Sequence, residues 1–415
     1  MFRIIILSAL YLCTNTLAFA AESVIIGLTY PRTGAYKEEG LAQMRGALMA
    51  IEEINAQGGL LGHSVQLNSR DSSARPEKAA NNVDQFIRDG AAMVFGSVSS
   101  AEAVAAGKRA QQGKTIYFAT IGYADDVTVE NGHKYIFRES SSATMTGQAL
   151  GRYLSKHFPN KKYAYITADY SWGHSAESAI RANTNTTDTG KHTRILVPFP
   201  SSKQSDFIDA LTQVQHSDAQ VLALVLYGKD LVRAMRIAHS MGLTKKMQIV
   251  VPHLIQTAIE GAGPGAMEGV IGVEHWIWRA PELEKSEKGM AFVKNFDNKY
   301  GILPSSAAAS AYTVVQQWAD AARRSNSFKS SDVVRALEDH EYSLLKDKAQ
   351  WRAFDHQNSQ TVYVVRANQR DVVMKHPSRQ DFYEILDRVT TANTGISYEN
   401  WTELRRKASL PTSLQ

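Results

Sequence analysis

Short apolar runs alternate with amphipathic stretches from the beginning of the chain. Residues 24–28 (VIIGL) form an unbroken apolar run, which is typical of a parallel strand buried on both faces. In the segment 39–56, apolar residues from Met44 to Ile54 recur three or four positions apart, which predicts an amphipathic helix. The glycine pair at 58–59 ends this helix. The first predicted unit is therefore a strand followed by a helix.

The same unit repeats in two separate series. The first series continues with predicted strands at 64–68, 92–96 and 115–120 and predicted helices at 76–88 and 101–112. The second series has predicted strands at 163–167, 194–197, 221–227 and 248–251 and predicted helices at 173–184, 205–215 and 229–241. Repeated β-α-β units of this length form a parallel sheet with helices on both faces. Two series therefore predict two α/β lobes.

The C-terminal third of the chain is less regular. The amphipathic segment 305–323 predicts a helix whose apolar side belongs to the core, and residues 361–365 (TVYVV) predict a strand. From residue 390 onward the chain is polar and has no clear period. We expect this tail to be loosely attached.

Residues 1–20 predict an export signal. Arg3 precedes an apolar run at 4–12, and Ala18-Phe19-Ala20 fits the small-x-small cleavage pattern. The apolar run is too short to span a bilayer, which needs roughly 20 residues. We expect a mature periplasmic protein that begins at Ala21. The alternative is a retained membrane anchor.

Composition excludes several classes of protein. The single cysteine, Cys13, lies in the export segment, so the mature chain has no disulfide and no thiol nucleophile. Lipid attachment at Cys13 is disfavoured because Leu12 is too large for the usual signal. The formal net charge is +5 without a dense basic run, which indicates no nucleic-acid partner.

Motifs of enzyme chemistry are missing from the sequence. There is no HExxH, no GxSxG, and Gly107-Lys108 lacks the flanking residues of a phosphate-binding loop. The histidines are scattered rather than paired at metal-ligand spacing. We therefore expect no catalytic residues, no metal and no cofactor, although catalytic carboxylates need no motif.

Five stretches of the chain resemble a known family. They are residues 27–34 (GLTYPRTG), the helix and turn at 46–62, residues 95–100 (FGSVSS), residues 169–173 (DYSWG) and residues 355–357 (DHQ). Together they are similar to the periplasmic leucine/isoleucine/valine-type solute-binding proteins of ABC importers. The resemblance implies a type I periplasmic-binding fold, in which two Rossmann-like α/β lobes are joined by three crossing strands and close over a ligand.

The resemblance also implies a division of the chain. Lobe 1 would contain residues 21–139 and 275–346, and lobe 2 would contain residues 140–274 and 347–389. Residues 390–415 would form a C-terminal tail.

Ser99 and Ser100 follow a predicted strand and open a predicted helix. In open α/β sheets, ligands bind beyond the carboxyl ends of the strands, where helix N-termini attract anions. In the family, the positions of Ser100 and of the loop at Tyr123 hold the ligand carboxylate. The alternative for Ser99 is that it only caps the helix.

Aromatic residues follow other predicted strands. Trp172 stands where the family shows an aromatic residue before glycine, and Tyr170 lies two residues earlier. Tyr227 ends a strand of the second series. We expect these rings to wall the apolar part of the ligand, and core packing is the alternative for each of them.

One position departs from the family pattern. Amino-acid binders of this family carry an acidic residue after the strand-Pro step, to neutralise the ligand ammonium, whereas here Val251-Pro252 is followed by His253. A buried ammonium without an anion is costly. Either Glu39 supplies the negative charge, or the ligand is a carboxylate without an ammonium, or it is a neutral amide or urea-like solute. His253 donates a hydrogen bond to the ligand or is a packed loop residue.

The expected function is delivery of a small carboxylate- or amide-bearing solute, such as a branched-chain or other amino acid or a related organic acid, to the membrane subunits of an ABC permease. The protein would act as a monomer. A ligand-sensing receptor domain and a hydrolase that uses cleft carboxylates such as Glu39 and Asp126 are the two alternatives.

Overall fold

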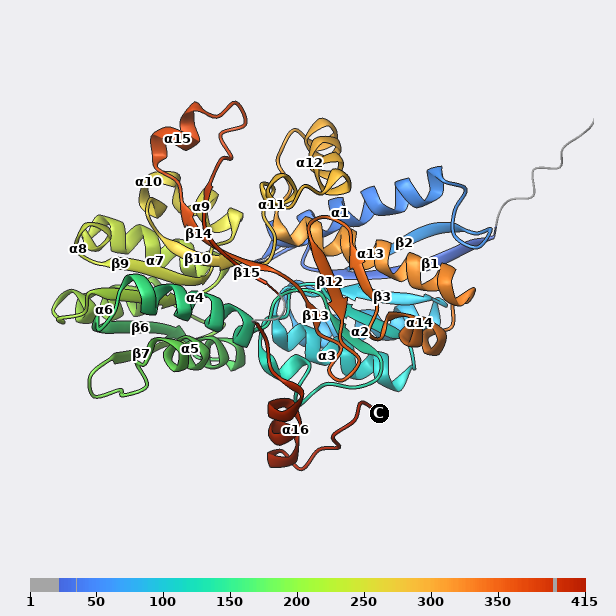
Figure 1. Cartoon of the computed structure of the whole chain (residues 1–415), viewed down its shortest axis with the longest axis horizontal. Coiled ribbons are helices and arrows are strands. Elements are labelled where there is room, and N and C mark those ends of the chain that lie inside the picture. Colours follow the sequence, from blue (N-terminus) through green and yellow to red (C-terminus); the bar gives the residue numbers. More distant parts are fainter. Residues whose placement is uncertain (1–21, 35, 391–393) are drawn as a thin grey trace, which may run out of the picture.

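The computed structural model describes residues 22–34, 36–390 and 394–415. The predicted export signal lies outside these described residues. Two α/β lobes stand side by side, and the chain passes between them several times (Figure 1).

Lobe 1 is built on a five-stranded sheet in the order β2-β1-β3-β4-β5, in which all strands are parallel. Alternate residues of one strand point to opposite faces: Met93 and Phe95 pack under one set of helices, and Val94 packs under another. Both faces of the sheet are therefore buried. The elements are β1 (Ser23–Tyr30), α1 (Lys37–Ala56), β2 (Ser64–Asp71), α2 (Pro76–Arg88), β3 (Met93–Gly96), α3 (Ser100–Gln112), β4 (Ile116–Ala119), η1 (Asp125–Val127), β5 (Ile136–Arg138), α11 (Ala280–Leu283), α12 (Glu287–Tyr300), α13 (Ser306–Ser325) and α14 (Ser330–Leu337).

Lobe 2 is built on a seven-stranded sheet in the order β15-β14-β10-β9-β8-β6-β7. Its first five strands along the chain are parallel, which confirms the four predicted strands and adds β10, but β14 and β15 run antiparallel to their neighbours. The elements are α4 (Ala143–His157), β6 (Tyr163–Ala168), α5 (Ser171–Thr184), β7 (Thr193–Val197), α6 (Gln204–Gln215), β8 (Val221–Val225), α7 (Gly228–Ser240), α8 (Leu243–Lys246), β9 (Gln248–His253), α9 (Gln256–Ala262), α10 (Pro264–Met267), β10 (Ile271–Glu274), β14 (Val362–Ala367), α15 (Arg370–Lys375) and β15 (Tyr383–Val389).

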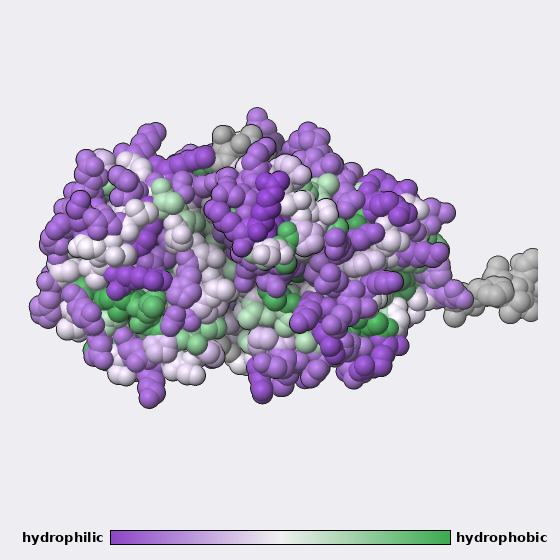
Figure 2. Space-filling model, turned by 90° about the horizontal axis from the view of Figure 1, so that it is seen from below, coloured by the Kyte–Doolittle hydropathy of each residue, from purple (hydrophilic) through white to green (hydrophobic). Residues whose placement is uncertain are grey.

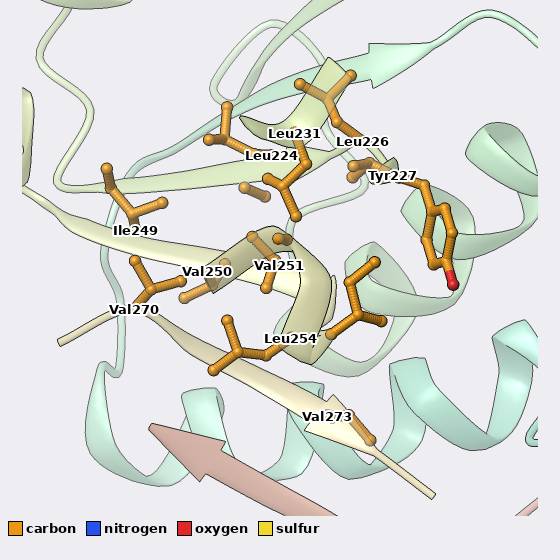
Figure 3. Close-up of a cluster of buried hydrophobic side chains, with 14 of the residues drawn as sticks. Leu224, Leu226, Tyr227, Leu231, Ile249, Val250, Val251, Leu254, Val270 and Val273 are labelled. Carbon is orange, nitrogen blue, oxygen red and sulfur yellow. The ribbon is translucent and has the colours of Figure 1, made fainter. Parts of the chain in front are cut away.

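The core of lobe 2 extends to the interlobe face. Figure 3 shows aliphatic side chains of β8, β9 and β10 packed together, among them Leu224, Val250 and Val273. Tyr227 lies at the edge of this cluster, and its hydroxyl points away from the aliphatic side chains. Tyr227, just after the end of β8, therefore places its ring between this core and the other lobe.

The division of the chain differs from the prediction in one place. A small antiparallel sheet of β11 (Glu341–Ser343), β12 (Lys348–Trp351) and β13 (Asn358–Ser359) follows α14. Trp351 packs against Phe118 and Phe137 of lobe 1. The third crossing thus lies between Ser359 and Val362, and residues 347–359 do not belong to lobe 2, because their apolar side chains complete the core of lobe 1.

The prediction of a loosely attached tail is wrong for its helix. The helix α16 (Tyr398–Lys407) buries Trp401, whose Nε1 donates to the Thr128 carbonyl at 3.0 Å. Arg405 donates to the Val129 carbonyl. The tail thus leaves lobe 2 after β15 and packs on lobe 1, which makes a fourth connection. The polar composition of the tail gave no sign of this packing, because Trp401 and Arg405 form their hydrogen bonds with residues far away in the sequence.

The surface offers no broad apolar area on the face shown in Figure 2, where hydrophilic residues predominate and apolar ones form small separate areas. Among the described residues, no helix combines the length and the apolar character that crossing a membrane requires.

Candidate functional site

The carboxyl ends of the two sheets face one another across the interlobe cleft. Four helices begin at these strand ends: α1 follows β1, α3 follows β3, α5 follows β6 and α7 follows β8. Ligands of open α/β sheets bind at such edges. The structure therefore brings the candidate residues of both lobes to one region.

Four rings and one imidazole form what we call the interlobe aromatic cluster: Tyr36, Tyr123, Trp172, Tyr227 and His253. Tyr227 lies 5.7 Å from Tyr36, 5.9 Å from Tyr123 and 6.0 Å from Trp172 between ring centroids. The His253 ring stacks on Tyr123 at 3.7 Å. All five side chains are buried. Tyr36 and Tyr123 come from lobe 1 and the others from lobe 2, so this cluster exists only when the lobes meet.

Tyr36 was not among the predicted site residues. It is the N-cap of α1, and its ring lies so close to Gly228 that a Cβ there would stand 2.6 Å from a ring carbon. The sequence did indicate that Tyr36 lies close to a strand end, because it follows Tyr30, the last residue of β1, by six residues. The sequence could not indicate which residue of the other lobe Tyr36 contacts.

Ser99 and Ser100 lie at the start of α3, as predicted, and both hydroxyls have partners within the chain. Ser99 forms a capping box with Glu102, and the Glu102 carboxylate also accepts the backbone N–H groups of Val98 and Ser99. The Ser100 hydroxyl accepts the Ala124 N–H at 3.0 Å. Glu102 thus accepts the amides before the helix and donates its own amide to Ser99, while the amides of Ser100 and Ala101 in the first turn of α3 have no intrahelical acceptor.

Glu39 connects the lobes. It lies on α1, is buried, and accepts a hydrogen bond of 2.6 Å from the Thr257 hydroxyl on α9. Burial raises the pKa of the Glu39 carboxyl, and the Thr257 hydrogen bond acts in the opposite direction. In this arrangement the Glu39 side chain forms a hydrogen bond between the two lobes.

His253 has no hydrogen-bond partner among the described residues on either ring nitrogen, although the side chain is fully buried. Burial lowers the pKa of His253 to about 3, so the imidazole is neutral at ordinary pH. A neutral imidazole offers one donor and one acceptor. The Trp172 Nε1 donor beside it also lacks a described partner.

Glu274 is a second residue of this region that was not among the predicted site residues. It is the last residue of β10, is 1 % exposed, and its Oε1 has no hydrogen-bond partner among the described residues. Burial raises the pKa of Glu274 to about 8, against the effect of a hydrogen bond from Ser306. Burial raises the pKa of Tyr123 and of Tyr227, and the charge of Glu274 adds to this effect, so Glu274 lies within electrostatic reach of the aromatic cluster.

Tyr170 lies at the mouth of the cleft rather than inside the cluster. It is half-buried and stacks on Phe199 at 4.0 Å. A cavity of about 480 Å³ opens here between the lobes. Its lining comes from lobe 1 (Tyr36, Ser73, Ala74, Arg75, Pro76, Ser99 and Ala101) and from lobe 2 (Tyr170, Ser171, Phe199, Pro200, Tyr227, Lys229 and Asp230).

Two other features of the structure lie away from this region. A cavity of about 580 Å³ on lobe 1 is lined by α12, α13 and β11 residues such as Lys288, Gln316 and Tyr342, far from the strand ends. Within the described ranges, no group of three or more His, Cys, Asp or Glu side chains is arranged to hold a metal ion. Asp126 lies in η1, where burial raises its pKa to about 6.

The region therefore combines three recognition elements: helix-start amides for an anion, aromatic faces for an apolar group, and buried polar atoms without partners. Buried polar groups in native proteins are nearly always hydrogen-bonded, and unpaired ones carry a desolvation cost. The unpaired atoms of Trp172, His253 and Glu274 thus mark a place where a polar ligand would complete the structure.

Comparison with known proteins finds similar sequences among binding proteins. A family model described as periplasmic binding protein matches residues 23–371. An amino acid binding protein of Pseudomonas aeruginosa is 26% identical over 352 residues, which cover 83% of this chain and 89% of that protein. A leucine-, isoleucine-, valine-, threonine-, and alanine-binding protein of the same species is 25% identical over 325 residues, which cover 77% and 84%.

Solved structures confirm the predicted fold. A periplasmic binding protein from Burkholderia mallei matches with a TM-score of 0.81 and 22% sequence identity, over 92% of this chain and 98% of that one. The two-lobed type I periplasmic-binding architecture is therefore confirmed for this chain.

Proposed function

Because the chain belongs to the periplasmic binding protein family, we propose that it binds a small carboxylate- or amide-bearing solute between its lobes in the periplasm. It then delivers the solute to the membrane subunits of an ABC importer. Amino acids and related organic acids are the proposed class. The curated relatives named as amino-acid binders support this class.

The observation that carries the proposal is the set of unpartnered polar atoms inside the interlobe aromatic cluster. Trp172 Nε1 and both nitrogens of His253 are buried without described partners at the place where the two sheets meet. A solute with a polar group and an apolar group would satisfy these atoms and stack on the rings. The same solute would stabilise the closed state, because its contacts come from both lobes.

The roles proposed for the individual residues follow their positions. Ser100 and the backbone at Tyr123 would hold the anionic end of the solute near the start of α3. Trp172 and Tyr227 would contact its apolar part, and Tyr170 would cover the mouth of the cleft. Ser99 and Glu39 would act indirectly, since Ser99 caps α3 and Glu39 bonds to Thr257 across the cleft.

A thermal-shift screen tests this function. The panel contains amino acids, short-chain and aromatic carboxylates, amides and ureas. A solute that binds the folded state adds RT ln(1 + [L]/Kd) to its stability, so a binder raises the melting temperature in a concentration-dependent manner. If no solute of any of these classes shifted the melting temperature, the proposal would be wrong.

Tryptophan fluorescence locates the site once a binder is found. We expect the binder to change the emission of the wild-type protein, and W172F to lose most of this change. We expect W172A to bind roughly tenfold more weakly, because an aromatic contact contributes about 0.5–1.5 kcal/mol beyond the area buried. The control is W278F, since Trp278 lies outside the cluster beside Arg279. Equal loss of signal in both variants would contradict the placement.

A further inference from the structure

Glu274 stands directly beside the position where the family pattern is broken. In the parallel pairing of β9 and β10, Val273 is the partner of His253, so Glu274 is one residue beyond it at the same edge of the sheet. Strand β10 therefore ends beside β9 and carries a buried carboxylate at its last residue, where β9 carries His253.

No cation of the described chain neutralises Glu274. None of the ion pairs among the described residues includes it, and His253 on the neighbouring strand and His275 next in the chain are uncharged: burial lowers the pKa of His253 to about 3 and that of His275 well below its usual range. An isolated buried carboxylate is unfavourable unless it is paired or protonated. Without a cationic ligand, Glu274 is therefore held in its protonated form.

The other candidate carboxylate is already engaged. Glu39 accepts the Thr257 hydroxyl at 2.6 Å, and this bond holds the two lobes together. Glu274 instead has one carboxylate oxygen without a described partner, and its charge, like that of Glu39, acts on both Tyr123 and Tyr227. The faces of tyrosine and tryptophan rings attract cations, which reinforces a carboxylate beside them.

We propose that Glu274 is the counter-charge for a ligand ammonium, and that the solute is therefore an amine-bearing carboxylate, an α-amino acid with an apolar side chain. This inference rests on the proposed function and narrows its ligand class. The carboxylate of the solute would lie at the start of α3, its ammonium at Glu274, and its side chain among Trp172 and Tyr227.

The proposal includes a proton transfer. Near pH 7 the ligand-free protein holds a proton on Glu274, whose pKa burial raises to about 8. A bound ammonium stabilises the carboxylate form, so the Glu274 proton passes to solvent as the solute enters. Close to one proton is then released per solute bound, and affinity rises as the pH increases toward 8.

The surrounding titratable groups do not account for such a release. Tyr123, Tyr227 and Tyr383 have pKa values raised above their usual range, and His253 and His275 stay neutral. Ser306 contributes only a hydroxyl. Glu139, whose pKa burial raises to about 7, lies near His275, and Lys346, whose pKa burial lowers to about 8, donates to the His275 carbonyl. Both groups require a control, and both remain in the E274Q variant.

Calorimetric titration of the mature protein tests the inference with matched solutes. Each apolar α-amino acid is compared with its deamino acid and its amide, for example L-leucine with 4-methylpentanoate and leucinamide, and L-phenylalanine with 3-phenylpropanoate and phenylalaninamide. We expect the wild-type protein to prefer the amino acid over the deamino acid by about 10- to 100-fold, as one hydrogen-bonded charge pair provides. We expect E274Q to lose that preference and to release no proton, as read from titrations in two buffers of different ionisation enthalpy.

E39Q tests the other candidate for the counter-charge, and it leaves Glu139 and Glu274 unchanged. We expect E39Q to keep the preference for the amine and the proton release. If E39Q lost both and E274Q kept both, Glu274 would not be the counter-charge. Wild-type binding of deamino acids, or of amides and ureas that lack an amine, without binding of any amino acid would overturn this inference and leave the solute-binding function standing. If no solute bound at all, both the inference and the solute-binding function would be overturned.

The melting temperature of E274Q checks that this variant folds. A value equal to or higher than that of the wild-type protein would show that it does.

Discussion

Single residues control how closely the two lobes approach. Gly228 has a φ of +53°, and a Cβ at this position would lie 2.6 Å from the Tyr36 ring of the opposite lobe. The residue is therefore required to be small for two separate reasons: the backbone is in the left-handed region, and the other lobe packs against its α-carbon.

These two reasons can be separated by substitution. G228A should weaken solute binding by about tenfold or more, because the added methyl group holds the closed lobes apart, at an overpacking cost of roughly 1–3 kcal/mol. G242A is the matched control, since Gly242 has a φ of +72° with nothing within 4 Å of its added Cβ. Both variants carry the backbone strain, so similar affinities in titration calorimetry would refute the steric argument.

The C-terminal helix α16 is the element whose behaviour the sequence pattern misrepresented. Trp401 is fully buried among Val129, Ile396 and Phe354, and Arg405 donates to backbone carbonyls of the loop after η1. Since β15 lies in the sheet of lobe 2, this helix gives lobe 2 an additional attachment to lobe 1.

Truncation of the buried ring tests how firmly α16 is held. W401A should lower the free energy of unfolding of the unit that contains α16 by about 3–5 kcal/mol, as for other buried aromatic residues. Y398A is the control on the same helix, because Tyr398 is 51 % exposed and should change stability by less than about 1 kcal/mol. Denaturant titration gives both values. A W401A midpoint equal to that of Y398A would mean that α16 contributes little.

At the scale of the whole molecule, direct contact between the lobes stabilises the closed arrangement. The hydrogen bond from Thr257 to Glu39 and the packing of Tyr36 on Gly228 both join lobe 1 to lobe 2. Binding proteins of this architecture exchange between open and closed states by hinge motion, and a ligand shifts that equilibrium through its contacts with the closed state.

Removal of the hydroxyl at the interface should shift the ligand-free molecule toward the open state. In T257V, the closed form leaves the buried Glu39 carboxyl without its partner, at a cost of about 1–3 kcal/mol, while the open form exposes it to water. Small-angle X-ray scattering should give a larger radius of gyration for T257V than for wild type without solute. T244V is the control, because Thr244 lies on the exposed helix α8. Identical scattering of all three proteins would contradict the role of this bond.

The local elements were predictable because their signals are local. The apolar spacing of 39–56 and 76–88 and the serine pair before α3 each depend on neighbours within a few residues, and the structure contains these helices. The predicted residues Trp172, Tyr227 and His253 also lie together, because they stand at or just after the ends of parallel strands of one sheet, which share an edge. Tyr123 comes from the sheet of lobe 1 and meets them only through contact between the lobes.

The missed features depend on partners far away in the sequence. Glu274 becomes a site residue because β10 pairs with β9, and Tyr36 because lobe 2 closes on it. Trp351 and Trp401 join lobe 1 through contacts with residues more than 200 positions earlier. Periodicity along the chain carries no information on such pairings.

The amino-acid sequence by itself determined the two-lobed α/β architecture and the edge at which a solute would bind, since strand-helix alternation and strand ends are properties of consecutive residues. Only the tertiary structure decided which buried carboxylate keeps an oxygen without a described partner. Strand order and lobe closure decide this, because they pair Glu39 with Thr257 and Glu102 with the N-terminus of α3, while Oε1 of Glu274 has no described hydrogen-bond partner.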